Sequence, residues 1–339
     1  MDKIIEELKH LTAIPAVSGH EDKILFELYH LIKPLADEVS IDRIGNLTVT
    51  INGRLENEPT LLLFAHVDEI GLMVRKIEDN GFLRFERIGG LPEKTLLGQF
   101  VDIYSIDKDS SITGVIGTIS HHLTPADKKY SIPDRLGMYI DLGLRREEVL
   151  ARGIDIGSIV TYHHNFKRIS KNRITSKALD NRVGVHLLLR LIKYLKTDPP
   201  TGTVYIVFSV QEEFNVRGLL PVFEKLKPNA SICIDITPAC DTPDLNMIYN
   251  IELGKGPAIT QMNFHGRGTL GGIIPNPKLR RFIELVAEDL KLPYQREVIV
   301  GVITDDSFTQ MTGTEGVAMG HISVPLRYTH SPIETADLR

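Results

Sequence analysis

Two continuous apolar runs constrain the fold of this chain most strongly. Residues 61–65 read Leu-Leu-Leu-Phe-Ala, and residues 204–208 read Val-Tyr-Ile-Val-Phe. A strand that is apolar at every position is buried on both faces, which is typical of a parallel sheet covered by helices on each side. Amphipathic helical patterns occur beside these runs, over residues 22–32 and 183–195. The sequence therefore predicts an α/β core built on a doubly wound sheet.

The predicted core elements come from both ends of the chain. The first part contains predicted helices over residues 3–11 and 22–32, followed by strands over 46–51 and 61–65. Helices and strands alternate again in the later part. The later helices are expected over 183–195, 219–226 and 278–291, and the later strands over 203–210, 230–236 and 316–324.

The segment from about residue 70 to about residue 164 has a different pattern, with short strands and turn residues. Strands are expected over 71–77, 82–88, 100–106, 112–119 and 158–162, with one helix over 145–152. Because helices and buried strands resume afterwards, we expect a small β-rich, barrel-like domain inserted into the α/β domain. The predicted division is residues 1–69 and 165–339 for the α/β domain and 70–164 for the insertion.

Composition excludes several classes of function. The chain of 339 residues is 42% hydrophobic and 24% charged, as in ordinary globular proteins. Its 39 basic and 44 acidic residues give a formal charge of −5, which provides no general attraction to nucleic acid or anionic membranes. The apolar runs are far shorter than the roughly 18 residues that cross a bilayer, and the first residues lack a secretory signal pattern. We therefore expect a cytoplasmic protein without nucleic-acid or membrane partners.

Side chains that bind metals follow the predicted buried strands. In an open α/β sheet, ligands bind at the carboxyl ends of the strands. Two imidazoles and three carboxylates lie at these ends or at the start of the next helix: His66, Asp180, Glu213, Asp235 and His330. This donor set suits two borderline divalent ions with one bridging carboxylate, and it fits zinc, cobalt or manganese better than calcium.

Each of these residues taken alone has a plainer interpretation. Asp180 is also a suitable cap for the helix that follows it. The pair Glu212-Glu213 is equally compatible with the start of a helix, where acids favour the dipole. A single histidine such as His330 is usually structural. The metal interpretation depends on the five residues occurring together at one edge of one predicted sheet.

Two further carboxylates have expected roles beside the metal ligands. Glu212 is adjacent to Glu213, so one of the pair can bind a metal while the other acts as general base. Asp68 lies two residues after His66 and projects from the same side of the strand. A carboxylate in that position is the usual means of fixing the tautomer of a ligating imidazole.

Five separated motifs resemble those of the glutamyl and deblocking aminopeptidase family of dinuclear metallopeptidases, which includes the tetrahedral TET aminopeptidases. They occur in the family's order, and the match extends from residue 1 nearly to the end of the chain. The motifs are Ala65-His66-Val67-Asp68-Glu69-Ile70-Gly71, Ala178-Leu179-Asp180-Asn181-Arg182, Gln211-Glu212-Glu213, Ile234-Asp235 and Arg327-Tyr328-Thr329-His330-Ser331.

The resemblance implies a phosphorylase/hydrolase-like α/β fold in which the insertion is a dimerisation domain. It implies a metal-dependent aminopeptidase that removes the N-terminal residue of peptides and assembles from dimers into a hollow dodecamer. Two divalent ions per subunit, zinc or cobalt, are expected. The implied roles are one ion bound by His66 and Asp235, the other by Glu213 and His330, a bridge by Asp180, general base catalysis by Glu212, and orientation of His66 by Asp68.

The chain departs from the family pattern in three places. Phe214-Asn215 replaces the usual Val-Gly after the paired glutamates, so we expect an altered pocket wall. Residues 303–306 read Ile-Thr-Asp-Asp where the family has Gly-Thr-Asp-Ala. Members of the family also normally continue into a helix after the last histidine, whereas this sequence ends at Arg339.

Three rival interpretations remain to be compared. A related dinuclear deacylase or carboxypeptidase would use similar ligands, but the β-rich insertion directly after the first motif disfavours it. A non-catalytic binding protein on the same fold would be expected to lose a ligand or the base, and none is missing. A polysaccharide hydrolase using Glu212 and Glu213 is excluded, because adjacent carboxylates cannot flank a sugar from opposite sides.

Two expectations concern the inserted domain. A small β domain beside a larger core leaves strand edges and apolar surface, and a second subunit is the simplest cover for them. His121-His122 and residues 127–130 lie in the longest loop of the insertion. This loop is either a lid that reaches a neighbouring site or a mobile surface loop.

Overall fold

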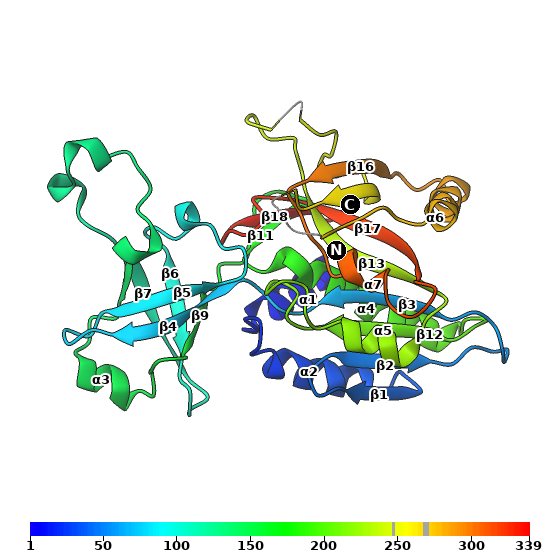
Figure 1. The fold of residues 1–339 in the computed structure, drawn as a ribbon, viewed down its shortest axis with the longest axis horizontal. Helices are drawn as coiled ribbons and strands as arrows, with labels where there is room; N and C mark the ends of the chain where they lie inside the picture. The colour runs from blue at the N-terminus through cyan, green and yellow to red at the C-terminus, as the bar shows by residue number, and fades with distance from the viewer. Residues whose placement is uncertain (246–247, 267–270) are drawn as a thin grey trace.

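The computed structural model describes residues 1–245, 248–266 and 271–339, and the chain forms a large α/β part with a small barrel beside it (Figure 1). The α/β part contains, in chain order, α1 (Asp2–Ala13), α2 (Asp22–Ile32), β1 (Glu38–Ile41), β2 (Leu47–Ile51), β3 (Leu61–His66), β10 (Lys167–Arg168), β11 (Arg173–Ser176), α4 (Leu179–Thr197), β12 (Val204–Ser209), α5 (Leu220–Leu226), β13 (Ala230–Pro238), β14 (Ala258–Phe264), β15 (Gly272–Ile273), α6 (Pro277–Asp289), β16 (Gln295–Val300), α7 (Asp306–Thr309), β17 (Ala318–Arg327) and β18 (Glu334–Asp337).

The strands of this part form one mixed sheet in the order β1-β2-β12-β3-β13-β17-β18-β11-β10, with β14 joined to β17 and carrying β15 and β16. The central strands β12, β3, β13 and β17 run parallel to one another. Their carboxyl ends therefore lie at the same edge of the sheet, as expected for a doubly wound α/β fold.

The apolar run of β3 is explained by burial on both faces. Leu63 and Ala65 pack into the core cluster that also contains side chains of α2 and α4. The alternate residues Leu62 and Phe64 pack into a second cluster with α5. Because successive side chains of a strand point to opposite faces, α5 covers the face opposite to α2 and α4. The α/β core predicted from this run is confirmed.

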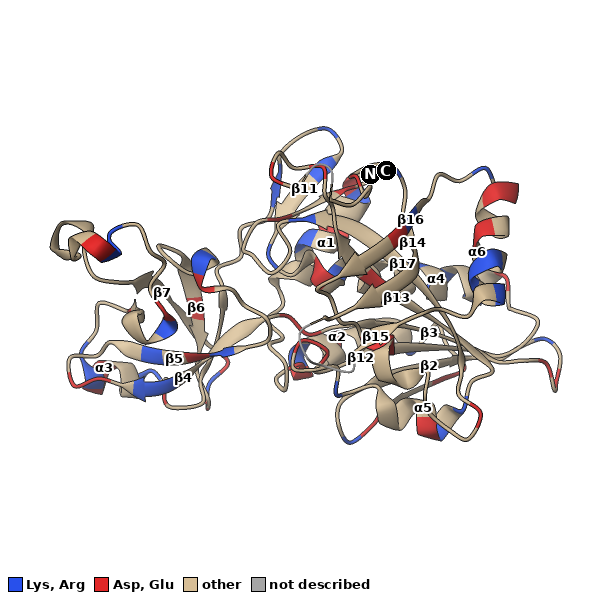
Figure 2. Cartoon of the chain, turned by 45° about the horizontal axis from the view of Figure 1, so that its top comes forward, with Lys and Arg blue, Asp and Glu red and all other residues tan. Residues whose placement is uncertain are grey.

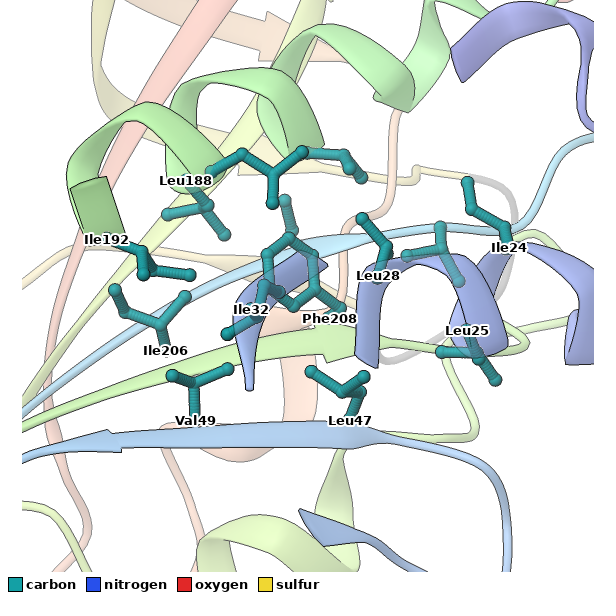
Figure 3. Packing of buried hydrophobic residues seen from close by; sticks show 14 of the residues in the cluster. Ile24, Leu25, Leu28, Ile32, Leu47, Val49, Leu188, Ile192, Ile206 and Phe208 are labelled. Carbon is teal, nitrogen blue, oxygen red and sulfur yellow. The ribbon is translucent and has the colours of Figure 1, made fainter. Parts of the chain in front are cut away.

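Of the two clusters that cover β3, the one with side chains of α2 and α4 contains more buried apolar residues. Figure 3 shows Leu28 and Ile32 of α2 and Leu188 of α4 directed toward Phe208 of β12 and Val49 of β2. All five side chains are fully buried or nearly so. This packing fixes α2 and α4 on the sheet and so fixes the start of α4 near the carboxyl edge.

The chain leaves the α/β part after β3 and returns to it before β10, and the residues between form a closed barrel in the order β4-β5-β8-β7-β6-β9. Its elements are β4 (Gly71–Ile77), β5 (Leu83–Ile88), β6 (Phe100–Tyr104), β7 (Ser111–Gly117), β8 (Tyr139–Asp141), α3 (Arg146–Ala151) and β9 (Ile159–Tyr162). Phe85, Ile103, Ile140 and Val160 fill the interior. The expectation of a barrel-like β insertion is confirmed.

Closure of the barrel corrects one expectation. We expected open strand edges that need a cover, but a closed barrel has no edge. The apolar residues that remain exposed lie on its outer surface and in the loop between β7 and β8. Phe100 is 60% exposed, Leu123 76% and Tyr130 93%. The tip of the loop between β7 and β8 stands on the side of the barrel away from the α/β part (Figure 1).

The remaining differences from the predicted elements concern short or late strands. β8 closes the barrel but has three residues, too few for a recognisable alternation. β1, β11 and β18, with four residues each, were likewise not predicted, and neither were β14 and β16, with seven and six residues. The helix predicted from residue 183 begins earlier, as α4, and the strand predicted to end at residue 324 extends to Arg327 in β17.

The surface carries charges of both signs. Basic and acidic residues are interspersed over the barrel strands and along α6 (Figure 2). On α6, Arg281 pairs with Glu284 and Glu288. Among the helices that the structure describes, each is too short or too polar to cross a membrane.

A matched pair of substitutions on α2 tests the packing. Leu28 is fully buried and Leu31 is 51% exposed on the same helix. Leu28→Ala is expected to lower the free energy of unfolding by about 2–5 kcal/mol, because it leaves a cavity in the core. Leu31→Ala is expected to change it by less than about 0.5 kcal/mol. Urea unfolding followed by circular dichroism measures both, and equal effects of the two substitutions would contradict the packing described.

Candidate metal centre

All seven residues predicted for the site lie together at the carboxyl edge of the central strands. His66 ends β3, and Asp235 lies near the end of β13. The other predicted residues follow a strand or begin a helix. Glu212 and Glu213 come just after β12, His330 lies in the turn between β17 and β18, Asp180 is the second residue of α4, and Asp68 follows β3 by two residues.

The carboxylate of Asp180 faces two separate groups of side chains. Its Oδ1 lies 3.2 Å from Nε2 of His66, and its Oδ2 lies 3.6 Å from Nε2 of His330. Asp235 Oδ1 is 3.7 Å from the same nitrogen of His66. Glu213 Oε1 is 3.4 Å from the same nitrogen of His330. Asp180 is thus shared by two histidine–carboxylate pairs.

Main-chain carbonyls orient both imidazoles. Nδ1 of His66 lies 3.1 Å from the carbonyl oxygen of Asp68, and Nδ1 of His330 lies 3.0 Å from that of Gly90. Because a carbonyl only accepts, each Nδ1 carries the proton and donates it. Nε2 of each ring is then left to face the carboxylates, which is the arrangement of a histidine that binds a metal.

This donor set fits a cation in each group. When Nε2 of each ring is neutral, this nitrogen and the facing carboxylate oxygens are all acceptors, so a metal cation can be bound between them. The ligand atoms of His66, Asp180 and Asp235 lie within 4.8 Å of one another, and so do those of Asp180, Glu213 and His330. Imidazole and carboxylate ligands in these numbers suit zinc or a similar divalent ion.

Burial and mutual repulsion disfavour the ionised form of the carboxyl groups gathered in this site. Burial raises the pKa of Glu212 well above its ordinary value, and Glu213 and Asp235 raise it further. Burial also raises the pKa of Glu213 and of Asp235. Burial disfavours the charged form of His66, but hydrogen bonds with Asp180, Asp235 and Asp68 outweigh burial and raise its pKa. A bound divalent cation would stabilise the ionised carboxylates instead.

Asp68 contacts more of the site than its expected partner His66. Its Oδ1 lies 3.6 Å from Nδ1 of His66 and accepts a hydrogen bond from the main-chain N–H of Glu212 at 3.0 Å. Its Oδ2 accepts from the N–H of Glu213 at 3.1 Å and from Ser18 Oγ at 2.6 Å. Asp68 therefore fixes the backbone of the two glutamates as well as lying beside the imidazole.

A buried ion pair joins two of the loops that carry site residues. Nζ of Lys177 lies 2.8 and 2.7 Å from the two carboxylate oxygens of Glu69, and both side chains are almost fully buried. Glu69 follows Asp68, and Lys177 precedes Asp180 by three residues. The sequence analysis missed Lys177; its only sequence signal is a basic residue just before the Ala178–Asp180 motif.

Glu334 is a second buried residue that the sequence analysis missed. Its carboxylate accepts hydrogen bonds from the main-chain N–H groups of Asp180 and His330. It is an acid in a four-residue strand, β18, and its partners are the backbone N–H of His330, four residues earlier, and that of Asp180, 154 residues earlier. We find no local pattern that would have identified it.

A third cluster of metal-binding residue types lies outside these two groups. It consists of Cys233, Asp306 and His321, all buried. His321 Nδ1 and Asp306 Oδ2 are 2.6 Å apart, a direct hydrogen bond. The corresponding distances around Asp180 are 3.2 and 3.6 Å. The shorter contact satisfies Asp306 and His321 through each other and leaves no room for an ion between them.

A cavity of about 410 Å³ lies on the Glu213 side of the site and is lined in part by Phe214 and Asn215. Phe214 is 42% exposed, and the guanidinium of Arg217 lies over its ring at 5.6 Å from the centroid. Asn215 has a positive φ of 68°. These two residues therefore place an aromatic ring and an amide where the smaller Val-Gly would leave space.

Comparisons with known proteins agree with the predicted resemblance. Residues 45–339 match the M42 glutamyl aminopeptidase family. SgcX of Escherichia coli strain K12, a putative aminopeptidase by name, is 40% identical over 335 residues, covering 98% of this chain and 89% of the relative. The solved structure of aminopeptidase APDkam598 from the archaeon Desulfurococcus kamchatkensis has a TM-score of 0.92 and 37% identity, covering 99% of this chain and 91% of that chain.

A further solved structure is that of the TET1 peptidase of Pyrococcus horikoshii, which is described as assembling into a tetrahedron or a large octahedral shell. Its TM-score is 0.86 at 31% identity, covering 99% of this chain and 94% of that chain. The family model spans most of the sequence and includes every residue of the candidate centre. This chain belongs to the M42 glutamyl aminopeptidase family.

Proposed function

We propose that this protein removes the N-terminal residue of peptides at a two-metal centre bridged by Asp180, with Glu212 as the general base. Family membership makes the protein a metal-dependent aminopeptidase; the number of ions and the residue roles are our proposal. The observation that carries it is the position of Asp180, whose two oxygens face different histidines. A single-ion site would not need a carboxylate shared in this way.

In this proposal Asp180 would help to hold both ions. His66 and Asp235 complete the first set of ligands, and Glu213 and His330 complete the second. Zinc or cobalt is the metal expected from the family resemblance, and the imidazole and carboxylate ligands are compatible with either. Bound ions would supply Lewis acids that polarise the scissile carbonyl and lower the pKa of the attacking water.

Glu212 is placed for proton transfer beside this centre. One of its carboxylate oxygens lies within 4.8 Å of ligand atoms of His66 and Glu213. Asp68 holds its main-chain N–H, which keeps the side chain beside the ligands. In the proposed reaction Glu212 takes the proton of the attacking water and delivers it to the nitrogen of the leaving amine. One water molecule is consumed for each peptide bond that is cleaved.

We propose that residues 1–69 and 165–339 form the catalytic domain and that residues 70–164 form a dimerisation domain within a homo-oligomer. The exposed apolar side chains on the outside of the barrel support this, since Phe100 and Leu123 are more than half exposed. The described assembly of the Pyrococcus horikoshii relative into closed shells is a second support.

Substitution of each of the two adjacent glutamates distinguishes the proposed general base from the proposed metal ligand. Wild-type protein is expected to contain two divalent ions per chain. Glu212→Gln is expected to keep both and to lower kcat by about 10²- to 10⁴-fold, the range for loss of a general base. Glu213→Gln is expected to lose one ion, because it removes a charged ligand. Elemental analysis and steady-state kinetics on an aminoacyl substrate measure these effects. If the two variants have the same metal content, the assignment of roles is wrong.

The proposed assembly predicts a mass in solution well above that of one chain. Light scattering at several concentrations is expected to give a multiple of 38.0 kDa. Phe100→Glu, on the outside of the barrel, is expected to lower the mass. Ile41→Glu is the control, since Ile41 is 46% exposed on β1, away from the barrel. A fully active wild-type monomer would refute the assembly without affecting the proposed chemistry.

A further inference from the structure

We propose that Glu334 is a positioning residue, which sets the separation of Asp180 and His330 by accepting a hydrogen bond from the main chain of each. This inference rests on the proposed two-metal centre, where these two residues bind the same ion. Glu334 itself does not touch the ligand atoms. It acts through the backbone of the residues that carry them.

The two hydrogen bonds use different oxygens of one carboxylate. Oε2 of Glu334 accepts from the N–H of Asp180 at 3.0 Å, and Oε1 accepts from the N–H of His330 at 2.9 Å. The residue is 2% exposed, so water does not compete for these oxygens. The carboxylate therefore links two ligands that are 150 residues apart in the sequence.

Glu334 is itself held by the sheet on both sides. It begins β18, where it pairs with Ser176 of β11, and the next residue, Thr335, pairs with Arg327 of β17. β11 leads directly toward Asp180 at the start of α4, and the turn after β17 carries His330. The carboxylate is thus fixed at the meeting point of the two segments that it joins.

The backbones of both ligands lie outside regular structure, and that of His330 in particular needs support from its surroundings. Asp180 has φ −78° and ψ 107°, which are not helical values although the residue lies within the bounds of α4. His330 has a φ of 59°, in the left-handed region that residues other than glycine rarely adopt. A conformation of this kind persists only when the surrounding contacts determine it.

Burying the carboxylate of Glu334 costs free energy, and the positioning role accounts for the presence of this group. An acid buried beside Asp180 is unfavourable unless its oxygens are hydrogen-bonded. A glutamine would offer one acceptor oxygen, whereas a carboxylate offers two in different directions. Asp68 makes the same kind of link on the other side of the centre, where its two oxygens accept from the N–H groups of Glu212 and Glu213.

The test measures binding of Co²⁺ to the metal-free full chain, by visible absorption in competition with a chelator, which resolves successive dissociation constants. Glu334→Gln keeps the size of the side chain but turns an amide donor toward one of the N–H groups. One dissociation constant is expected to rise about 10- to 100-fold, as for other partners that orient metal ligands. The other constant is expected to rise less, because Asp180 is its only ligand that Glu334 positions, while His66 and Asp235 keep their contacts.

Two further variants make the result specific. Asp337→Asn is the matched control, since Asp337 is an acid with a buried side chain on the same strand that pairs with Arg173 and Arg339. It is expected to leave both constants unchanged. Glu334→Asp keeps the charge but is one methylene shorter, so it cannot reach both N–H groups. It is expected to weaken the same constant as Glu334→Gln, and it carries the test if Glu334→Gln does not fold.

Three outcomes would overturn the proposal. These are unchanged constants in folded Glu334→Gln, wild-type binding by Glu334→Asp, and an equal effect of Asp337→Asn. A wild-type protein that binds one ion only would refute the two-metal centre and not this inference. The role of Glu334 would then be tested by the dissociation constant of that one ion. A rise of this constant in Glu334→Gln supports the positioning role, and no change overturns it.

Discussion

The site depends on one shared carboxylate, that of Asp180, whose oxygens face His66 on one side and His330 on the other. Parallel strands make this possible, because β3, β13 and β17 end at the same edge of the sheet and α4 begins there. Gathering several acids in a buried place is unfavourable in the absence of a cation. In the proposed function the same acids would hold the metal ions, which accounts for their burial together.

Other buried charges hold the segments that carry these ligands. Asp68 accepts from the backbone of both glutamates after β12, and Glu334 accepts from the backbone of Asp180 and His330. The pair of Glu69 and Lys177 joins the segment after β3 to the one before α4. These interactions connect loops from distant parts of the chain to each other, so the geometry of the centre does not depend on any one loop alone.

Much of the fold could be predicted because burial determines how apolar residues are spaced along each helix and strand. The run at residues 61–65 lacks alternation because both faces of β3 are covered, and α2 has the bounds that its apolar spacing predicts. The candidate metal ligands could be recognised because five imidazoles and carboxylates occur together at one edge of one predicted sheet, although each taken alone has a plainer interpretation. Their assignment to particular ions came from the family resemblance.

The features that were missed depend on tertiary pairing. β8 closes the barrel with three residues, and closure removed the open edges that the sequence analysis expected. Glu334 could not be recognised because its partners are main-chain groups brought to it by the pairing of β18 with β11 and β17.

The most direct test of the central claim is anomalous diffraction from crystals of the metal-loaded protein. The account predicts two metal peaks per chain, one on each side of the Asp180 carboxylate. A single peak, or two peaks without Asp180 between them, would contradict it.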